Sequence, residues 1–305
     1  DLLLPYLLTE GRLSEDNLSI RESGNGIPDL IDEARNEVDF FLSIRDGEAY
    51  SQGVTNPSTE WTIMFQAGCT TMAAWANAAN CAMLAEAFRI HGDEELCAYY
   101  TEEAVKAYRY AEKQEWTQLD DLQNIGTSGM RGRDFKQMAA AFLYNLTGER
   151  SWEALMAQES VVKDGKSPVF SKQGRNQFYQ IWGTAAYLTC PHERHYPELY
   201  ANMKSSVNHQ ADENNVNHMY ARPSRRTAND PRWQTSQNLQ MVMLAHYIAD
   251  NSERRSRLEA AMYIEAGWGL GRNPANIVEM TGLGERHIVD CYTTGRNDGT
   301  PGSHP

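Results

Sequence analysis

Apolar residues recur at helical spacing along most of the chain. The clearest stripe repeats every three or four residues and predicts a helix; its members are Ile27, Leu30, Ile31, Ala34, Val38, Phe41 and Leu42. A second stretch, residues 66–90, is rich in alanine and carries apolar or small side chains along one side. Small side chains let helices approach closely, so this stretch is predicted to form an inner, well-buried helix.

The same periodicity predicts further helices over much of the remaining chain. They cover residues 93–114, 134–146, 178–189, 196–208, 234–249 and 252–270, with a shorter helix from Trp152. We expect roughly nine or ten helices and no convincing strand. Polar stretches such as 48–60 and 210–232 separate some helices, whereas a few residues join others. This alternation favours helical hairpins in a barrel, with short turns on one side and site-building long loops on the other.

Several residues predict where helices begin and end. Pro28 suits the first turn of its helix, where a missing N–H costs nothing. Ser151 and Ser252 are expected to cap the helices that follow them. Gly148 is expected to end one helix and Gly271 to end the last one in a left-handed conformation.

Two acidic residues near the start of the chain stand three positions apart, on one face of a predicted helix. Asp29 and Asp32 could in principle work as a catalytic pair. The alternative, which we favour, is that they face solvent and interact with the positive end of the helix dipole.

Composition restricts the kinds of partner. The 305 residues carry a formal net charge of −13, which disfavours a phosphate backbone, so we expect no nucleic acid partner. No apolar run is long enough for a membrane span, and we expect none. The 7 Trp and 15 Tyr suit the faces of sugar rings and protein cores equally well.

Metal sites find little support in the residue spacing. The five cysteines form no CxxC pair, so we expect buried free thiols. His192 and His195 have a spacing that ligands use, but no third ligand follows from the pattern, and a solvated turn is the favoured interpretation. His209, Asp212, Glu213 and His218 read as part of a polar loop. We therefore predict no metal ligands.

The end of the chain is rich in glycine, arginine, asparagine and aspartate. It contains LGRNP at 270–274, MTGLG at 280–284 and TGRNDGTPG at 294–302. Glycines let the backbone turn tightly and approach a ligand, and the polar side chains can bind hydroxyl groups. A long surface loop is the alternative that the pattern alone leaves open.

Two of these motifs and one early stretch resemble glycoside hydrolase family 9, a cellulase family. The early stretch is ESGNGIPDLIDEAR at 22–35, and the late motifs are LGRNP and MTGLG. The alanine-rich helix from Thr70 is similar to one that lines the family's barrel. The resemblance implies an all-α fold, an (α/α)6 barrel of helical hairpins that is incomplete in this chain. Residues 1–305 would be part of one catalytic domain.

The resemblance also implies a reaction. It is the inverting hydrolysis of β-glycosidic bonds in cellulose-like or related β-1,4-glucans and oligosaccharides, by a carboxylate base and a carboxylic acid ~6.5–9.5 Å apart. The family carries its base in an Asp-Ala-Gly-Asp motif and its acid in an Asn-Glu segment. Neither occurs in residues 1–305, so the catalytic residues stay unassigned and are expected in flanking segments.

Two alternatives remain open beside the cellulase-like activity. One is an exo-acting glucosaminidase on chito-oligosaccharides, and the other is a non-catalytic sugar-binding or scaffold protein. The resemblance further implies a secreted or periplasmic protein, with a possible additional domain N-terminal to this segment. No cofactor is predicted; calcium occurs in some family members, but nothing here identifies its ligands.

Candidate substrate-binding residues follow from the resemblance and from side-chain chemistry. His287 and Arg296 are expected to contact sugar hydroxyls, because the family has a His-His-Arg cluster after the glycine motif and Arg suits paired hydroxyls. A loop histidine satisfied by its own backbone is the alternative for His287. Asp298 could pair with Arg296 or with a cationic amino sugar.

Aromatic residues at helix–loop junctions are the other candidates. Trp233, Trp182 and Trp61 are each expected either to stack on a sugar or to pack in the core. Where cellulases usually carry an aromatic platform, this chain has Arg131 and Arg133. That departure favours shorter or modified glycans over long, flat cellulose.

Overall fold

The computed structural model describes residues 2–55, 63–115, 130–171, 177–214, 235–273, 276–280 and 282–287, with side chains at 214 and 235–238 left out. Helices dominate this part: α1 Leu3–Leu8, α2 Asp29–Ser43, α3 Thr71–His91, α4 Glu94–Lys113, α5 Gly132–Thr147, α6 Arg150–Glu159, α7 Ile181–Thr189, α8 Pro197–Asn214, α9 Thr235–Tyr247 and α10 Ser252–Gly269. The chain divides into two compact units, Asp1–Ser206 and Val207–Pro305. Each unit is described by itself.

Two small antiparallel ladders accompany the helices. Strand β1 (Val54–Thr55) pairs with β2 (Phe65–Gln66), and β3 (Phe170–Ser171) pairs with β4 (Phe178–Tyr179). The expectation of no strands was therefore wrong, as was the inclusion of residues 178–179 in a helix. Strands of two residues are too short to show an alternating pattern.

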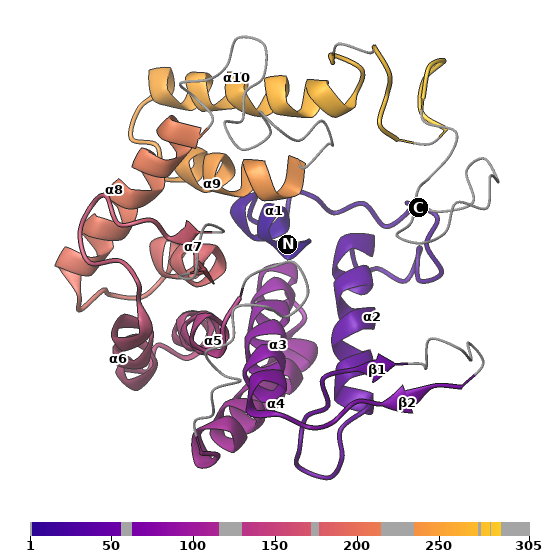
Figure 1. Cartoon of the computed structure of the whole chain (residues 1–305), viewed down its shortest axis with the longest axis vertical. Helices are drawn as coiled ribbons and strands as arrows, with labels where there is room; N and C mark the ends of the chain where they lie inside the picture. The colour runs from indigo at the N-terminus through magenta and orange to yellow at the C-terminus, as the bar shows by residue number, and fades with distance from the viewer. Residues whose placement is uncertain are drawn as a thin grey trace. The chain divides into compact units, whose positions relative to one another are not determined.

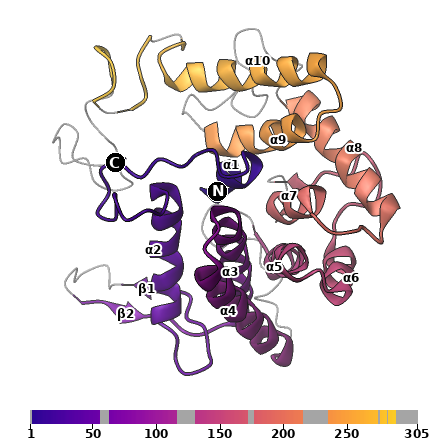
Figure 2. The same ribbon diagram turned by 180° about the vertical axis from the view of Figure 1, so that it is seen from behind.

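Helix α3 is the centre of the first unit. It packs against α1, α2, α4 and α5, as Figures 1 and 2 show. Its alanines at positions 74, 78, 79, 82, 85 and 87 are fully buried. A helix that is buried nearly all round has no polar face to present to water. The prediction of an inner, alanine-rich helix is confirmed, although it begins at Thr71 rather than at 66.

Aromatic side chains carry the packing of α3 outward to α4 and α6. The ring of Trp75 lies 4.8 Å from that of Tyr108, edge to face. Tyr108 in turn lies 4.9 Å from the ring of Trp152, again edge to face. Such T-shaped contacts are favoured by the charge distribution of aromatic rings.

Short turns close the helical hairpins of the first unit. Gly92, at φ 91°, ends α3, and Asp93 then caps α4 by accepting from Leu96 N. Gly148, at φ 69°, ends α5 one residue before the N-cap of α6. Both glycines adopt the left-handed conformation that side chains disfavour. The connections α4–α5 and α6–α7 are much longer, so the predicted alternation of short and long links is confirmed.

In the second unit α10 packs against α9, and residues 207–214 of α8 are tied to α10. Arg254 on α10 donates from Nη1 to both carboxylate oxygens of Asp212, at 3.0 and 3.2 Å. Its Nε donates to Asn208 Oδ1 at 3.2 Å. Asp212 thus lies on a helix, and the prediction of a polar loop from 210 was wrong because α8 continues to Asn214.

Helix starts were predicted less well than helix ends. Pro28 precedes α2 as its N-cap with ψ 129°, an extended value that cannot belong to the helix. Ser151 lies inside α6, whose N-cap is Glu149. Ser252 is the first residue of α10, and Asn251 caps it by accepting from Arg254 N at 2.9 Å. Gly271 has φ 101°, so the left-handed conformation expected after α10 is confirmed.

The cysteines differ in burial. Cys81 and Cys190 are buried free thiols, as expected. Cys69 is exposed and Cys97 half-buried, so the prediction was wrong for these two. Cys291 lies outside the described residues. Burial raises the pKa of the Cys190 thiol, which makes its reactive thiolate scarce at neutral pH.

The close approach of α5 and α7 gives a first prediction. A Cβ added at Gly183 would lie 1.9 Å from Gln137 Oε1, and Gln137 is fully buried and cannot turn toward water. Gly183→Ala should lower the free energy of unfolding by about 1–3 kcal/mol in urea denaturation. Gly68→Ala, where the added atom meets nothing within 4 Å, is the control. If Gly183→Ala and Gly68→Ala unfold at the same urea concentration, the predicted contact is wrong.

Candidate functional site

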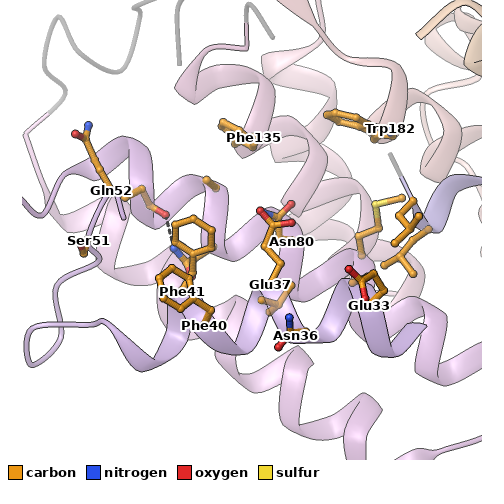
Figure 3. A pocket seen from close by; sticks show the side chains of 18 residues that line it. Glu33, Asn36, Glu37, Phe40, Phe41, Ser51, Gln52, Asn80, Phe135 and Trp182 are labelled. Atoms are coloured by element: carbon orange, nitrogen blue, oxygen red, sulfur yellow. Dashed lines mark hydrogen bonds between the residues drawn. The ribbon is translucent and has the colours of Figure 1, made fainter. Parts of the chain in front are cut away.

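A cavity of about 1230 Å³ lies in the first unit, between α2 and α3 and beneath the starts of α5 and α7. Figure 3 shows its lining. Helix α2 contributes Glu33, Asn36, Glu37, Phe40 and Phe41, and α3 contributes Ala73, Ala76, Asn77, Asn80 and Met83. Aromatic faces can cover the C–H faces of a ligand, and amides and carboxylates can bind its hydroxyl groups.

Three helices reach the cavity with their first turns. Ala73 comes from the start of α3, Phe135 from that of α5, and Trp182 from that of α7. The connections that lead into these helices are long, residues 44–70, 114–131 and 160–180. The N-terminal ends of helices carry partial positive charge and free N–H groups. The long connections and the cavity are therefore at the same end of these hairpins.

Trp182 is the predicted site residue that the structure places at the cavity. Its ring packs against the ring of Tyr179, with centroids 4.7 Å apart. Its indole Nε1 is buried and has no hydrogen-bond partner among the described residues. The indole is thus held from behind by Tyr179, and its contact with a sugar stays a prediction.

His287 lies in the second unit, in the segment after α10. Its Nδ1 is 2.9 Å from Gly284 O, so the ring is bound to its own loop. Gly282 and Gly284 have positive φ angles, 77° and 74°. Asn273, in the LGRNP motif, donates from Nδ2 to Ile277 O at 2.7 Å and closes the turn locally. Whether His287 contacts a sugar stays a prediction.

Four of the predicted substrate-binding residues lie outside the described residues. They are Arg296, Asp298, Trp233 and Trp61. Their assignments from the sequence stay predictions.

The early acidic pair is structural and buried. Asp29 accepts through Oδ2 from Leu18 N at 2.5 Å and Ser23 Oγ at 2.8 Å. Asp32 accepts from Asn25 Nδ2 at 2.9 Å. Both side chains are almost completely buried, so the expectation that they face solvent was wrong. They hold the loop before α2 and do not line the cavity.

The arginines that replace an expected aromatic platform are already engaged. Arg131 forms an ion pair with Asp134 at 2.8 Å, and Arg133 with Glu159 at 3.2 Å. Each guanidinium group therefore already has a carboxylate partner within the protein.

The two histidines after α7 also have partners within the protein. His192 Nε2 lies 3.0 Å from Asn145 O, and His195 Nδ1 lies 2.7 Å from Glu153 Oε2. The expectation of a solvated turn was wrong, because both rings are anchored to neighbouring helices. Within the described ranges, no group of three or more His, Cys, Asp or Glu could hold a metal ion. Across the same residues, no helix combines the length and the apolar character that a membrane crossing requires.

Sequence reasoning missed Phe135 and the aromatic residues of α2 as part of a site. Phe40 is 41% exposed and lies outside the apolar stripe of its helix. Phe135 is the fourth residue of α5, inside a stretch that periodicity assigns to the core. In the sequence, only its position just after the long segment between the predicted helices 93–114 and 134–146 could have indicated that Phe135 belongs to a site.

Comparison with known proteins agrees with this architecture. The model of glycosyl hydrolase family 9 matches residues 8–300. The chain therefore belongs to glycosyl hydrolase family 9. No curated protein sequence matches it.

Three solved structures illustrate the likeness. A family 9 protein of Bacteroides ovatus is 20% identical, with a TM-score of 0.72, and the match covers 94% of this chain and 56% of that one. A metagenome-derived family 9 endoglucanase is 22% identical, with a TM-score of 0.71. The match covers 94% of this chain and 55% of the endoglucanase. A single mutant (D468A) of a thermostable endoglucanase from Alicyclobacillus acidocaldarius is 17% identical, with a TM-score of 0.63. The match covers 94% of this chain and 57% of that one.

These likenesses concern the fold, and the chain spans a little over half the length of each structure. The predicted all-α fold of helical hairpins, that of the family's (α/α)6 barrel, is confirmed. That residues 1–305 belong to one catalytic domain stays a prediction.

The buried Asp32 gives a prediction on pH. Burial raises the pKa of its carboxyl group above the ordinary value, although the hydrogen bond from Asn25 and the charge of Arg35 act against the rise. The folded protein thus holds this proton more tightly than the unfolded chain, so the contribution to stability is present at low pH and is lost as pH rises through the raised pKa. Wild type should therefore gain stability relative to Asp32→Asn between about pH 7 and about pH 4.

Urea denaturation at both pH values measures this difference. Glu48→Gln, a change at an exposed carboxyl group in the same unit, is the control. The prediction would be contradicted if the difference in the free energy of unfolding between wild type and Asp32→Asn is the same at both pH values, or if wild type loses stability relative to the variant at the lower pH.

Proposed function

We propose that this chain is part of an enzyme that hydrolyses β-1,4-glucosidic bonds with inversion. The observation that carries the proposal is the cavity at the starts of α3, α5 and α7, in a chain that belongs to glycosyl hydrolase family 9. Solved relatives of the fold bear the name endoglucanase.

The lining of the cavity suits a glucan chain. Phe135 and Trp182 offer aromatic surfaces to the C–H faces of the sugar rings. Asn36 and Asn80 each offer a donor and an acceptor to sugar hydroxyls, and both side chains are exposed toward the space between α2 and α3. A glucan would displace weakly held water from the aromatic faces and exchange hydrogen bonds at its hydroxyls.

Inverting hydrolysis needs a carboxylate that activates water and a carboxylic acid that protonates the leaving oxygen. A secreted or periplasmic location of the enzyme is part of the proposal. Within the described chain the proposal assigns glycan binding and leaves the two reacting groups unassigned.

One observation favours the second candidate, a glucosaminidase acting on chito-oligosaccharides. Glu33 and Glu37 are exposed at the cavity and form no ion pair with any residue that the structure describes. Two free carboxylates beside a sugar site would attract a protonated amino sugar, and the net charge of −13 adds to that attraction.

Activity of the full-length protein on cellohexaose and on the chitosan hexamer tests both candidates. Proton NMR during the reaction should show release of the α-anomer, because a β-bond is cleaved with inversion. Cleavage of cellohexaose alone supports the first candidate and cleavage of the chitosan hexamer alone the second. Binding of either sugar without cleavage would overturn both in favour of a non-catalytic protein.

Trp182→Ala provides the residue-level prediction. Loss of an aromatic contact of about 0.5–1.5 kcal/mol should raise the KM for the cleaved hexamer about 2- to 10-fold. Tyr99→Ala is the matched control, since Tyr99 is also a partly exposed aromatic residue but lies on α4 and does not line the cavity. An equal KM for Trp182→Ala and wild type would remove Trp182 from the proposed site.

A further inference from the structure

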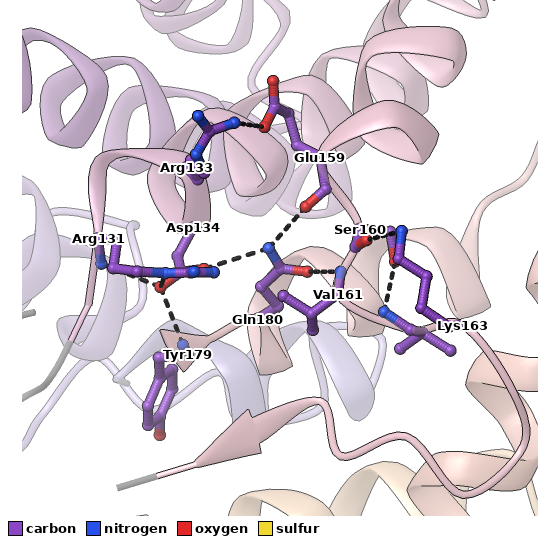
Figure 4. A network of polar contacts seen from close by, with 10 residues as sticks. Arg131, Arg133, Asp134, Glu159, Ser160, Val161, Lys163, Tyr179 and Gln180 are labelled. Carbon is purple, nitrogen blue, oxygen red and sulfur yellow. Dashed lines mark hydrogen bonds and ion pairs between the residues drawn. The ribbon is translucent and has the colours of Figure 1, made fainter. Parts of the chain in front are cut away.

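A fully buried carboxylate ties the start of α5 to the residues just before α7. Asp134 accepts through Oδ2 from Tyr179 N at 3.0 Å and from Arg131 N at 2.9 Å. Its Oδ1 accepts from Gln180 Nε2 at 3.2 Å. The Arg131 guanidinium adds a two-point ion pair, with Nη2 at 2.8 Å from Oδ1 and Nε at 3.2 Å from Oδ2. Figure 4 shows this network.

Gln180 extends the network to the end of α6. Its Nε2 also donates to Glu159 O at 2.9 Å, and its Oε1 accepts from Val161 N at 2.9 Å. Gln180 is buried, so each of these bonds is sheltered from competing water. Three segments far apart in the sequence are therefore held in one geometry around Asp134.

The network is one contact away from both aromatic residues at the starts of α5 and α7. Phe135 follows Asp134 directly in α5 and lines the cavity. Tyr179, whose N–H is bound to Asp134, packs its ring 4.7 Å from that of Trp182. The ring of Phe170 also packs against that of Tyr179, with ring centroids 5.2 Å apart. The orientation of Trp182 therefore depends on a short chain of contacts that begins at the carboxylate.

Only a carboxylate satisfies all of these donors. Every partner of Asp134 is an N–H group, and an ionised carboxylate accepts at both oxygens. An asparagine at this position would turn an NH₂ group toward one set of donors. Arg131 is partly exposed, with 19% of its side chain accessible, so changing Asp134 to a neutral residue leaves no fully buried cation without a partner.

We propose that Asp134, together with Arg131, is a positioning residue for glycan binding: it sets the orientation of Trp182 and Phe135 in the cavity wall. Neither residue touches the sugar. The proposal rests on the proposed function for its kinetic consequence, but its structural consequence at Trp182 does not depend on any activity.

The structural consequence is tested by tryptophan fluorescence. The difference between the spectra of a protein and of the same protein with Trp182→Phe isolates the emission of Trp182. In wild type this emission should be blue-shifted and only moderately quenched by acrylamide, because the indole Nε1 is buried while part of the ring is exposed at the cavity. In Arg131→Gln and Asp134→Asn it should shift to the red and be quenched more strongly.

The matched control is Glu153→Gln. Glu153 is another buried carboxylate, which accepts from Tyr187 Oη at 2.8 Å and pairs with His195 at 2.7 Å. It holds the other end of α7 and does not line the cavity. A general loss of stability should affect this variant as much as Asp134→Asn, yet leave the emission of Trp182 unchanged.

The kinetic consequence is tested by a double-mutant cycle on the hexamer that the full-length protein cleaves. Arg131→Gln should raise KM about 2- to 10-fold, the range of one aromatic contact, with kcat nearly unchanged. In the Trp182→Phe background the same change should have a markedly smaller effect, because it acts through Trp182. Arg131→Lys, which keeps one charged contact, should fall between wild type and Arg131→Gln.

The outcomes separate the two proposals. An unchanged Trp182 emission in both Arg131→Gln and folded Asp134→Asn overturns the positioning role, as does an equal KM effect in both backgrounds. If Asp134→Asn does not fold, the Trp182 emission and the KM of Arg131→Gln alone test the positioning role. A shifted emission in a protein that cleaves no glycan supports the positioning of Trp182 and overturns the proposed function instead.

Discussion

The close packing of α3 is the constraint on which the first unit depends. Its alanines are buried on nearly every side, so α1, α2, α4 and α5 approach its backbone directly. Interiors of this kind are packed as densely as organic crystals, so even a few added atoms force neighbouring side chains to shift and lower stability. The wide cavity between α2 and α3 is the exception to this packing: there α3 presents Ala76 and Asn80 to open space instead of to a neighbouring helix.

The hairpin arrangement determines where chemistry can occur. Two-residue links close α3 to α4 and α5 to α6, and they leave no room for functional side chains. The long links enter at the starts of α5 and α7, where Phe135 and Trp182 reach the cavity. Rigid helices can thus hold a site whose variable part lies in loops, which is the usual division of labour in enzymes. Membership of glycosyl hydrolase family 9 fits this division.

Buried carboxylates join segments of the chain at several places in the first unit. Asp29 and Asp32 hold the loop before α2, Asp134 joins the starts of α5 and α7, and Glu153 joins α6 to the far end of α7. Asp134 and Glu153 accept hydrogen bonds from groups that are distant in the sequence, whereas the donors to Asp29 and Asp32 come from the loop just before α2. A buried charge is tolerated because its donors are in place, and removing one partner leaves an uncompensated group. These residues fix irregular segments that helix packing alone cannot hold.

The sequence by itself determined the helices from α2 onward, the short turn at Gly148, the buried character of α3 and the family, but it did not predict α1. Helical periodicity and glycine caps are local signals, and the motifs at 22–35 and 270–284 are specific. Of the candidate site, it anticipated Trp182 but not Phe135, and it placed Asp29, Asp32, His192 and His195 near solvent. Only the tertiary structure decided these points, because burial and hydrogen-bond partners depend on segments that are distant in the chain. The spacing of two aspartates reveals that they share a helix face, whereas only the folding of the preceding loop back onto them, with donors at Leu18, Ser23 and Asn25, decides that they are buried.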